Sequence, residues 1–193
     1  VEDNGAIWAG FGYGVDYYYQ DKTSNVISTP RPYSISYSAS TQEVLLTAHD
    51  EGIIACRNGK VIHQYKMNNC GFIPHNLVYT VKEDRKGNWW VGSYMGLSVR
   101  YNDGRSYCFN QLEGMDELLS KETTCIAEGH DGSLWLATNN NGIVHVTGNM
   151  EQPTSLRCKN YCIENGLLPV NTPLSFPVDT KDCLWAGTEG SGL

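Results

Sequence analysis

One pattern recurs along the whole chain and limits the folds that the chain can adopt. In the copy from Glu83 to Tyr101 (EDRKGNWWVGSYMGLSVRY), a polar turn joins two short runs, the second run contains Trp90 and Gly92, and Gly96 opens a third run. Asp, Asn and Gly between apolar runs are typical of hairpin turns, because these residues tolerate a positive φ. Each copy therefore predicts three antiparallel strands joined by tight turns.

The alternation of large and small residues predicts that these sheets stack. Residues two apart on a strand share a face, so Trp90 and Gly92 place a large side chain beside a gap. Burying a large apolar side chain stabilises a fold by roughly 1.5 to 3 kcal/mol. One small sheet cannot cover its own Trp, and we expect a neighbouring sheet to do so.

The pattern occurs five times, and its second copy is degenerate. Taking Leu46 as the residue that replaces Trp in the run Val44 to Ala48, the five positions lie 38, 44, 45 and 50 residues apart: Trp8, Leu46, Trp90, Trp135 and Trp185. Asn-Gly or Asp-Gly turns precede two further runs, Lys60 to Lys66 and Arg105 to Phe109, which predict a fourth, outer strand. A period near 44 residues is the size of a four-stranded propeller blade.

The predicted fold is therefore all-β: a β-propeller of four-stranded antiparallel blades, of which this chain is a partial arc of roughly four blades. We expect an incomplete blade at 1–38, blades at 39–80, 81–124 and 125–173, and an incomplete blade at 174–193. The two ends could complete one blade and close a four-bladed ring, but we favour an open arc, since strained four-blade closure is rarer. The chain begins and ends inside a copy, so we expect it to be a segment of a longer protein.

The bulk composition excludes several classes of function. A formal net charge of -7 without a basic cluster argues against nucleic acid and against anionic membrane surfaces. No apolar run approaches the roughly eighteen residues of a membrane-spanning helix. The seven cysteines are scattered without a C-x-x-C pair, which favours buried fillers over zinc ligands. We expect no metal and no cofactor.

The repeats resemble the two-component regulator propeller repeat. The most similar copy is Asp179 to Leu193, which ends LWAGTEGSGL; EDNGAIWAG, EDRKGNWWVG and DGSLWLATNNNGI also match, whereas the second copy departs in lacking Trp. The resemblance implies the extracytoplasmic sensor region of a hybrid two-component histidine kinase of the Bacteroides type. It implies a periplasmic location, a sensor homodimer, further propeller blades and a kinase elsewhere in the full protein. In this family, such sensors detect oligosaccharides.

Recurring acidic residues lie at the first turn of the copies: Glu2, Asp3, Glu83, Asp84, Glu128 and Asp179. They lack the further oxygen ligands of a calcium loop. A propeller hydrolase would need two carboxylates a few ångströms apart at the substrate end of the channel. The first turn lies on the face opposite the second turn, and no G-x-S-x-G motif is present. We therefore expect these acids to be structural and this segment not to be an enzyme.

The second turn of each copy is the better candidate for a binding site. Its closing glycine recurs in every copy while the preceding residues differ, and a rigid frame with varied tips is how repeat proteins build a binding face. Aromatic rings beside Asn, Asp and His suit an oligosaccharide. The candidate ligand-binding residues are Tyr13, His49, Asp50, Tyr94, Asn139, Asn140 and Asn141. The alternative is that these tips are merely solvated.

Three functions follow from these observations. The leading hypothesis is a ligand-sensing propeller segment that recognises an oligosaccharide and signals to a histidine kinase. The alternatives are a propeller scaffold for protein partners without a small ligand, and a propeller lyase or glycoside hydrolase. The run Tyr17-Tyr18-Tyr19 could belong to a partner surface, but because alternate residues face opposite ways, we expect at least one of these rings to pack between blades.

Overall fold

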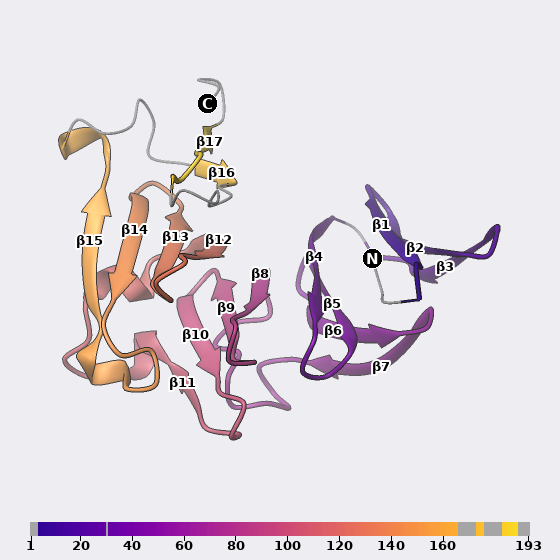
Figure 1. The fold of residues 1–193 in the computed structure, drawn as a ribbon, viewed down its shortest axis with the longest axis horizontal. Helices are drawn as coiled ribbons and strands as arrows, with labels where there is room; N and C mark the ends of the chain where they lie inside the picture. Colours follow the sequence, from indigo (N-terminus) through magenta and orange to yellow (C-terminus); the bar gives the residue numbers. More distant parts are fainter. Residues whose placement is uncertain (1–3, 30, 166–172, 176–182, 189–193) are drawn as a thin grey trace.

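The computed structural model describes residues 4–29, 31–165, 173–175 and 183–188, and it is an arc of antiparallel sheets. In these residues, three four-stranded sheets lie between a three-stranded sheet and a two-stranded sheet. Figure 1 shows the sheets following one another along the arc, with β1–β3 and β16–β17 at its two ends. This confirms the predicted all-β partial propeller.

Each sheet is a meander whose strands follow in chain order. The first contains β1 (Ile7–Phe11), β2 (Gly14–Tyr19) and β3 (Lys22–Ile27). The second contains β4 (Pro32–Ser38), β5 (Glu43–Ala48), β6 (Gly52–Arg57) and β7 (Lys60–Tyr65). The third contains β8 (Val78–Glu83), β9 (Trp89–Ser93), β10 (Gly96–Arg100) and β11 (Ser106–Cys108).

The fourth sheet contains β12 (Thr123–Glu128), β13 (Leu134–Thr138), β14 (Gly142–Thr147) and β15 (Arg157–Tyr161), and the last contains β16 (Pro173–Ser175) and β17 (Gly187–Thr188). Short 3-10 turns span Phe109–Gln111, Glu117–Ser120, Pro153–Ser155 and Ile163–Asn165. No helix in the described ranges is long and apolar enough to cross a membrane.

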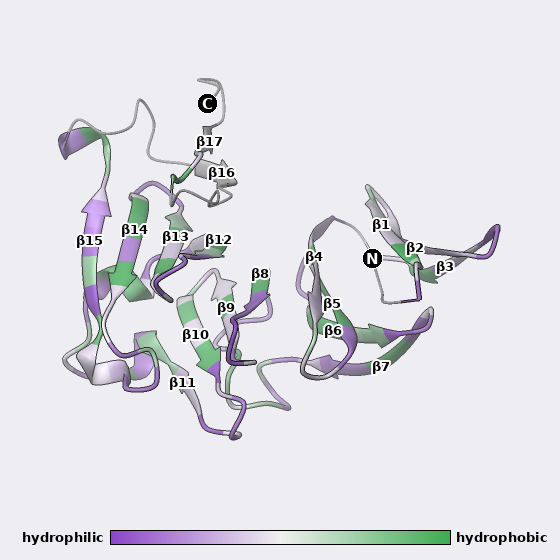
Figure 2. Ribbon diagram, viewed as in Figure 1, coloured by the Kyte–Doolittle hydropathy of each residue, from purple (hydrophilic) through white to green (hydrophobic). Residues whose placement is uncertain are grey.

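Figure 2 shows where the hydrophobic residues lie: middle strands such as β10 and β14 are rich in them, whereas the turns and the outer strand β15 are hydrophilic. The reason is that a middle strand is covered on both faces by neighbouring sheets, while an outer strand borders solvent. Accordingly β10 is buried except at Arg100, and β15 alternates between exposed and half-buried residues.

Where a following sheet is described, the repeated Trp packs against it, as predicted. Trp90 clusters with Leu134 and Val144 of the fourth sheet, and Trp8 clusters with Val44 of the second. Trp185 belongs to the last sheet, which no later sheet covers within the described residues, and it is 53% exposed. The repeated Trp is therefore buried only where a stacked neighbour covers it in addition to its parent sheet.

The register corrects one assignment in the second copy. Ala48 pairs with Gly52 across a tip of three residues, whereas Ser93 pairs with Gly96 across a tip of two. Counting back six residues from the glycine, as from Gly96 to Trp90, therefore stops one residue short in the second copy. Leu45, not Leu46, occupies the Trp position: it clusters with Trp89 of the following sheet, whereas Leu46 clusters with Trp8 of the preceding one.

The inner strands begin earlier than the predicted blade boundaries at residues 39, 81 and 125. β4, β8 and β12 start at Pro32, Val78 and Thr123, and each pairs with the strand that follows it. The serines that alternate along β4 (PYSISYS) hide this strand, because they give no apolar run to mark it.

The gap beside Trp90 is filled by the next sheet, as the sequence predicted. A Cβ atom on Gly92 would lie 2.7 Å from the carbonyl oxygen of Thr123 and 2.8 Å from Cγ2 of Thr80. The inner strand β12 therefore approaches β9 so closely that only glycine fits. In the first sheet, Tyr17 is buried and its ring centroid lies 5.0 Å from that of Trp8, which confirms that one tyrosine of the run packs in the core.

Candidate functional site

The tips of the second turns share one face with the beginnings of the inner strands. In the third sheet, Val78 at the start of β8 pairs with Ser93 at the end of β9, and the amide of Tyr94 donates to the carbonyl of Leu77 at 3.0 Å. We call this side the tip face: the β1–β2, β5–β6, β9–β10 and β13–β14 turns together with the first residues of β4, β8 and β12.

The glycine that closes each tip makes the frame rigid. Gly52 has a φ of 67°, and a Cβ there would lie 2.1 Å from the carbonyl oxygen of Tyr65 at the end of the outer strand. Gly142 has the same relation to Tyr161, at 2.2 Å. A side chain is excluded by both the backbone conformation and the close approach. The tip residues thus vary on a fixed support.

A repeated β-bulge places side chains at the inner rim of the tip face. The register skips one residue in β4, β8 and β12, and the bulged residues are Tyr33, Tyr79 and Thr124. A bulge turns a side chain away from the regular alternation of the strand. Thr47 fixes two bulges at once, since its Oγ1 accepts from the amide of Ser34 and donates to the carbonyl of Tyr79, both at 3.0 Å.

These bulges create a continuous series of contacts across three sheets, which we call the rim row: His49, Tyr33, Tyr79, Glu122 and Asn139. The Tyr33 ring centroid lies 6.4 Å from that of His49 and 5.2 Å from that of Tyr79, both edge-on. The Tyr79 hydroxyl donates to the Glu122 carboxylate. Asn139 Nδ2 donates to the other Glu122 oxygen at 2.9 Å.

The electrostatics of the rim row keep the Tyr79 hydroxyl protonated. Burial, followed by the hydrogen bond to the Glu122 carboxylate and its charge, raises the pKa of Tyr79 far above its ordinary value. Tyr79 therefore acts as a hydrogen-bond donor, and it holds the carboxylate of Glu122 in one orientation.

Of the predicted site residues, only two lie in the rim row. His49 and Asn139 belong to the rim row, and Asn141 Nδ2 donates to the carbonyl of Asn139 at 3.0 Å. Tyr94 is 54% exposed and its ring lies 5.3 Å from that of His75. Asp50 and Asn140 are exposed at their tips in left-handed backbone.

Tyr13, at the tip of the first sheet, is 90% exposed, and no described contact joins it to the rim row. Sequence reasoning missed Tyr33, Tyr79 and Glu122. The signal that could have found the tyrosines is positional: each is the second residue of its inner strand.

The acids at the first turn join neighbouring sheets on the opposite face. Glu83 accepts from the amide of Ser40 at 3.0 Å and from the Ser38 hydroxyl of the preceding sheet, and Glu128 accepts from the amide of Arg85 at 3.2 Å. This supports a structural role for both. Glu2, Asp3 and Asp179 lie outside the described residues.

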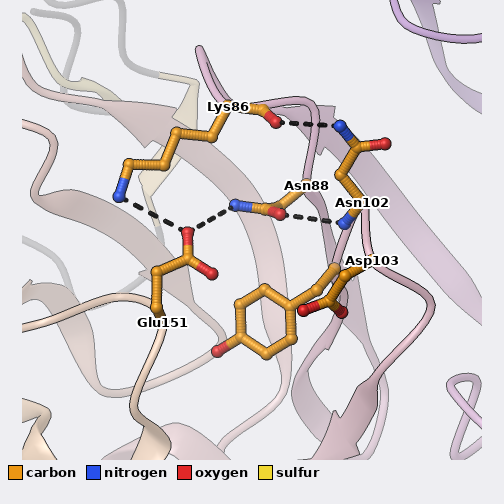
Figure 3. A pocket seen from close by; sticks show the side chains of 6 residues that line it. Lys86, Asn88, Asn102, Asp103 and Glu151 are labelled. Atoms are coloured by element: carbon orange, nitrogen blue, oxygen red, sulfur yellow. Dashed lines mark hydrogen bonds and ion pairs between the residues drawn. The ribbon is translucent and has the colours of Figure 1, made fainter.

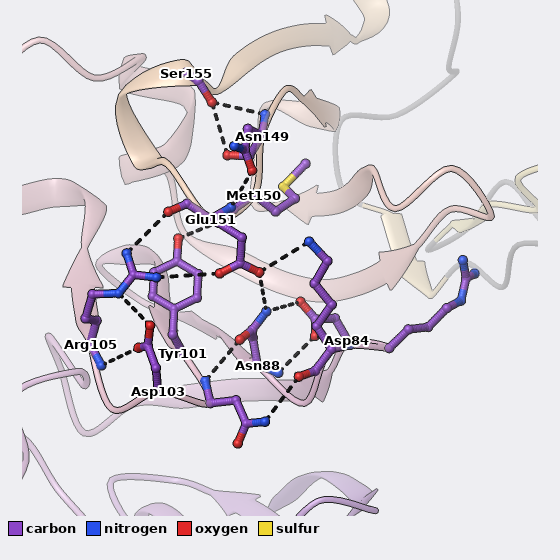
Figure 4. Close-up of polar contacts among 12 residues, drawn as sticks. Asp84, Asn88, Tyr101, Asp103, Arg105, Asn149, Met150, Glu151 and Ser155 are labelled. Carbon is purple, nitrogen blue, oxygen red and sulfur yellow. Dashed lines mark hydrogen bonds and ion pairs between the residues drawn. The ribbon is translucent and has the colours of Figure 1, made fainter.

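A hollow of about 350 Å³ lies between the third and fourth sheets, on this opposite side (Figure 3). Its lining consists of Lys86, Asn88, Tyr101, Asn102, Asp103 and Glu151. The Glu151 carboxylate receives Lys86 Nζ at 3.4 Å and Asn88 Nδ2 at 3.3 Å. Figure 4 shows that it also faces Arg105, whose Nη2 is 3.7 Å away, while the Tyr101 hydroxyl donates to the carbonyl of Met150. These groups satisfy one another, so we interpret the hollow as a joint between sheets.

Two segments, residues 73–95 and 117–140, match the sequence profile of the family described as Two component regulator propeller. Each segment ends at a tip of the tip face, and both include residues of the rim row. No curated protein matches the chain at a significant level.

Solved structures share the fold. The extracellular domain of BT3049 from B. thetaiotaomicron, assigned as a hybrid two component system, is 21% identical with a TM-score of 0.75, covering 97% of this chain and 25% of that one. The corresponding domain of BT4673 from the same organism is 17% identical with a TM-score of 0.69, covering 97% and 25%.

A gluconolactonase of Xanthomonas campestris, XC5397, is 14% identical with a TM-score of 0.64, covering 92% of this chain and 63% of that one. This chain thus spans about a quarter of the length of the two Bacteroides domains. A propeller fold supports unrelated functions, so these likenesses describe the architecture. The described residues thus form an arc of a β-propeller, and two of its segments, 73–95 and 117–140, match the two component regulator propeller repeat.

Proposed function

We propose that this chain is a ligand-sensing segment in the extracytoplasmic part of a two component sensor. It binds an oligosaccharide on the tip face, and the full protein passes the resulting change to a histidine kinase through propeller contacts and a sensor homodimer. The family match supports this proposal, as do the structures described as extracellular domains of hybrid two component systems.

The observation that carries the proposal is the rim row. Its aromatic rings, amide and carboxylate come from three adjacent sheets, and they combine ring faces with oriented polar groups. Sugar recognition needs both features, because a pyranose presents an apolar C–H face and a ring of hydroxyls. A ligand that contacts several sheets also changes the free energy of their packing, which is a route for a signal.

A thermal-shift screen against oligosaccharides tests the proposal. Ligand at one hundred times its Kd stabilises the folded state by about 2.7 kcal/mol, which is a measurable rise in Tm. We expect a saturable shift that His49→Ala in the rim row reduces most, and that Tyr13→Ala, Tyr94→Ala and Asn140→Ala at the tips of the same face reduce less. If the shift in Tm is unchanged in all four variants, the ligand binds elsewhere on the protein. If no sugar shifts the Tm, the result argues against a sugar sensor.

A protein scaffold without a small ligand is the second candidate. Phe11 and Tyr13 at the first tip are 52% and 90% exposed, and exposed aromatic residues are enriched where proteins associate. Under this alternative, Tyr13→Ala would weaken association with a protein partner and leave every sugar screen flat. Turnover of a sugar or lactone would instead favour an enzyme of the lyase or hydrolase type.

A further inference from the structure

The rim row contains a single carboxylate, that of Glu122. None of the ion pairs among the described residues includes Glu122, whose two oxygens accept from the neutral donors Tyr79 and Asn139. Two exposed residues of opposite charge lie next to His49: Asp50 follows it at the tip, and Arg31 accepts from the His49 amide at 3.3 Å through its carbonyl, so Glu122 is the charge that the row itself presents. Lys66 is already engaged, because its Nζ lies 2.9 Å from Oε2 of Glu51.

Glu122 is oriented and still has acceptor capacity. A carboxylate offers about four lone-pair sites, and one donor on each oxygen leaves room for further donors. Sugar hydroxyls are donors of this kind, and hydrogen bonds to an ionised acceptor are stronger than neutral ones. A sugar carboxylate or sulfate would instead meet a like charge in a partly desolvated position, where such juxtaposition is costly.

Two further groups of the row are suited to a ligand. The Tyr33 ring is 39% exposed and is held edge-on by Tyr79, so it can offer a face to an apolar surface. Nδ1 of His49 is buried and has no hydrogen-bond partner among the described residues. Buried polar atoms of native proteins are nearly always paired, so this nitrogen is a candidate for a hydroxyl of the ligand.

We propose that the rim row is a subsite for an uncharged sugar ring, in which Tyr33 packs on the ring, Glu122 accepts its hydroxyls, and the charge of Glu122 excludes uronic acids and sulfated sugars. This inference rests on the proposed function and specifies the ligand class of the same face.

The test compares neutral and acidic probes of equal length by isothermal titration calorimetry. The neutral panel is cellotetraose, maltotetraose, xylotetraose and mannotetraose, and the acidic panel is tetragalacturonate and a chondroitin sulfate tetrasaccharide. We expect at least one neutral probe to bind and no acidic probe to bind. Glu122→Gln is expected to weaken binding of the neutral probe about tenfold, because a charged hydrogen bond is lost. Tyr33→Ala is expected to weaken binding by a similar factor, because the ring contact is lost.

Matched control variants distinguish a loss of binding from a loss of folding. Glu113→Gln changes the same charge at an exposed site, and Tyr19→Ala removes a ring that is 37% exposed, close to the 39% of Tyr33; both are expected to bind as the parent protein does. Circular dichroism and Tm confirm that each variant folds.

Three outcomes would overturn the proposal. Binding of an acidic probe by the parent protein contradicts the exclusion of charge. A neutral probe that binds Glu122→Gln and Tyr33→Ala unchanged removes the assigned subsite but leaves the sugar-sensor function intact. Binding of no probe of either charge contradicts the proposed function itself, and this assignment with it.

Discussion

Asp84 organises the turn between β8 and β9 through four hydrogen bonds. Its carboxylate accepts from the amides of Lys86 and Asn88, from the Asn88 side chain and from Nε1 of Trp90, each at 2.9 Å. The residue is only 9% exposed. The recurring acid therefore serves two purposes that the sequence suggests only in part: it shapes the turn, and it satisfies the one polar atom of the buried Trp.

Replacing Asp84 should cost much of the stability of the protein. Asp84→Ala leaves several buried donors without an acceptor, and we expect the free energy of unfolding to fall by about 3 kcal/mol. Asp84→Asn keeps one acceptor and should cost less. Urea unfolding followed by Trp fluorescence measures both. Asp103→Ala, at an exposed turn, is the control, and an equal loss in that variant would contradict this role for Asp84.

Protonation of His145 makes the stability of the fourth sheet depend on pH. Its ring stacks on Trp135 with centroids 3.9 Å apart and an interplanar angle of 7°, and its Nε2 lies 2.9 Å from the Ser133 hydroxyl. Burial lowers the pKa of His145 below 6.5, and Lys159 acts in the same direction, while Asp131 opposes them. The folded state thus binds the proton more weakly than the unfolded state does.

The sign of the pH effect follows from this difference. Below pH 6.5 the unfolded chain takes up a proton at this residue before the folded protein does, so stability falls as the pH falls. We expect His145→Gln to flatten the decline in Tm between neutral pH and pH 5. His63→Gln, at an exposed position, should retain the slope of the parent protein, and an unchanged slope in His145→Gln would contradict the assignment.

Because β9 and β12 approach each other closely, a larger residue at Gly92 is expected to destabilise the packing of the third and fourth sheets. Gly92→Ala would place a methyl group 2.7 Å from the Thr123 carbonyl oxygen, so the sheets must separate locally. Overpacking of this kind costs about 2 kcal/mol. We expect a corresponding fall in the midpoint of chemical unfolding. Gly71→Ala, where no atom lies within 4 Å of the added Cβ, should be nearly neutral.

The strands could be predicted where their pattern is strong and not where it is weak. Trp, small residues and Asp/Asn-Gly turns placed β9, β10, β13 and β14 from sequence alone. The second copy was shifted by one residue, because its tip is longer and neither Leu45 nor Leu46 stands out from its neighbour. β4 could not be predicted, because its alternating serines give no hydrophobic pattern. Packing between the sheets nevertheless makes this segment a strand.

The candidate site was predicted only at its outer part. The varied tips are visible in the sequence because the closing glycine marks them, and His49 and Asn139 were identified in this way. Tyr33 and Tyr79 were not, because a bulge is a property of register, and pairing between strands cannot be read from either strand alone. Glu122 precedes its strand, and its relation to Tyr79 depends on how two sheets stack.

The first sheet leaves one edge of the arc open. Among the described residues β1 pairs only with β2, and its Ile7 and Phe11 are 51% and 52% exposed. An exposed, apolar strand edge promotes association, and charged residues prevent it. A protein of these 193 residues should therefore self-associate as its concentration rises, and Ile7→Lys with Phe11→Lys should keep it monomeric in sedimentation experiments. Ile163→Lys, at a residue 48% exposed outside the strands, should not.

The packing of each repeated Trp against the following sheet gives the arc a direction of growth. As the chain leaves the ribosome or a translocation channel, the Trp of the newest sheet stays bare until roughly 45 more residues have emerged, the length of one repeat. The sheets are then expected to fold in order from the first to the last, and at every stage the newest sheet exposes an apolar surface. Chaperones and the rate of chain synthesis would act on this transient surface, which the next sheet covers once it has formed; among the described residues, Trp185 remains 53% exposed.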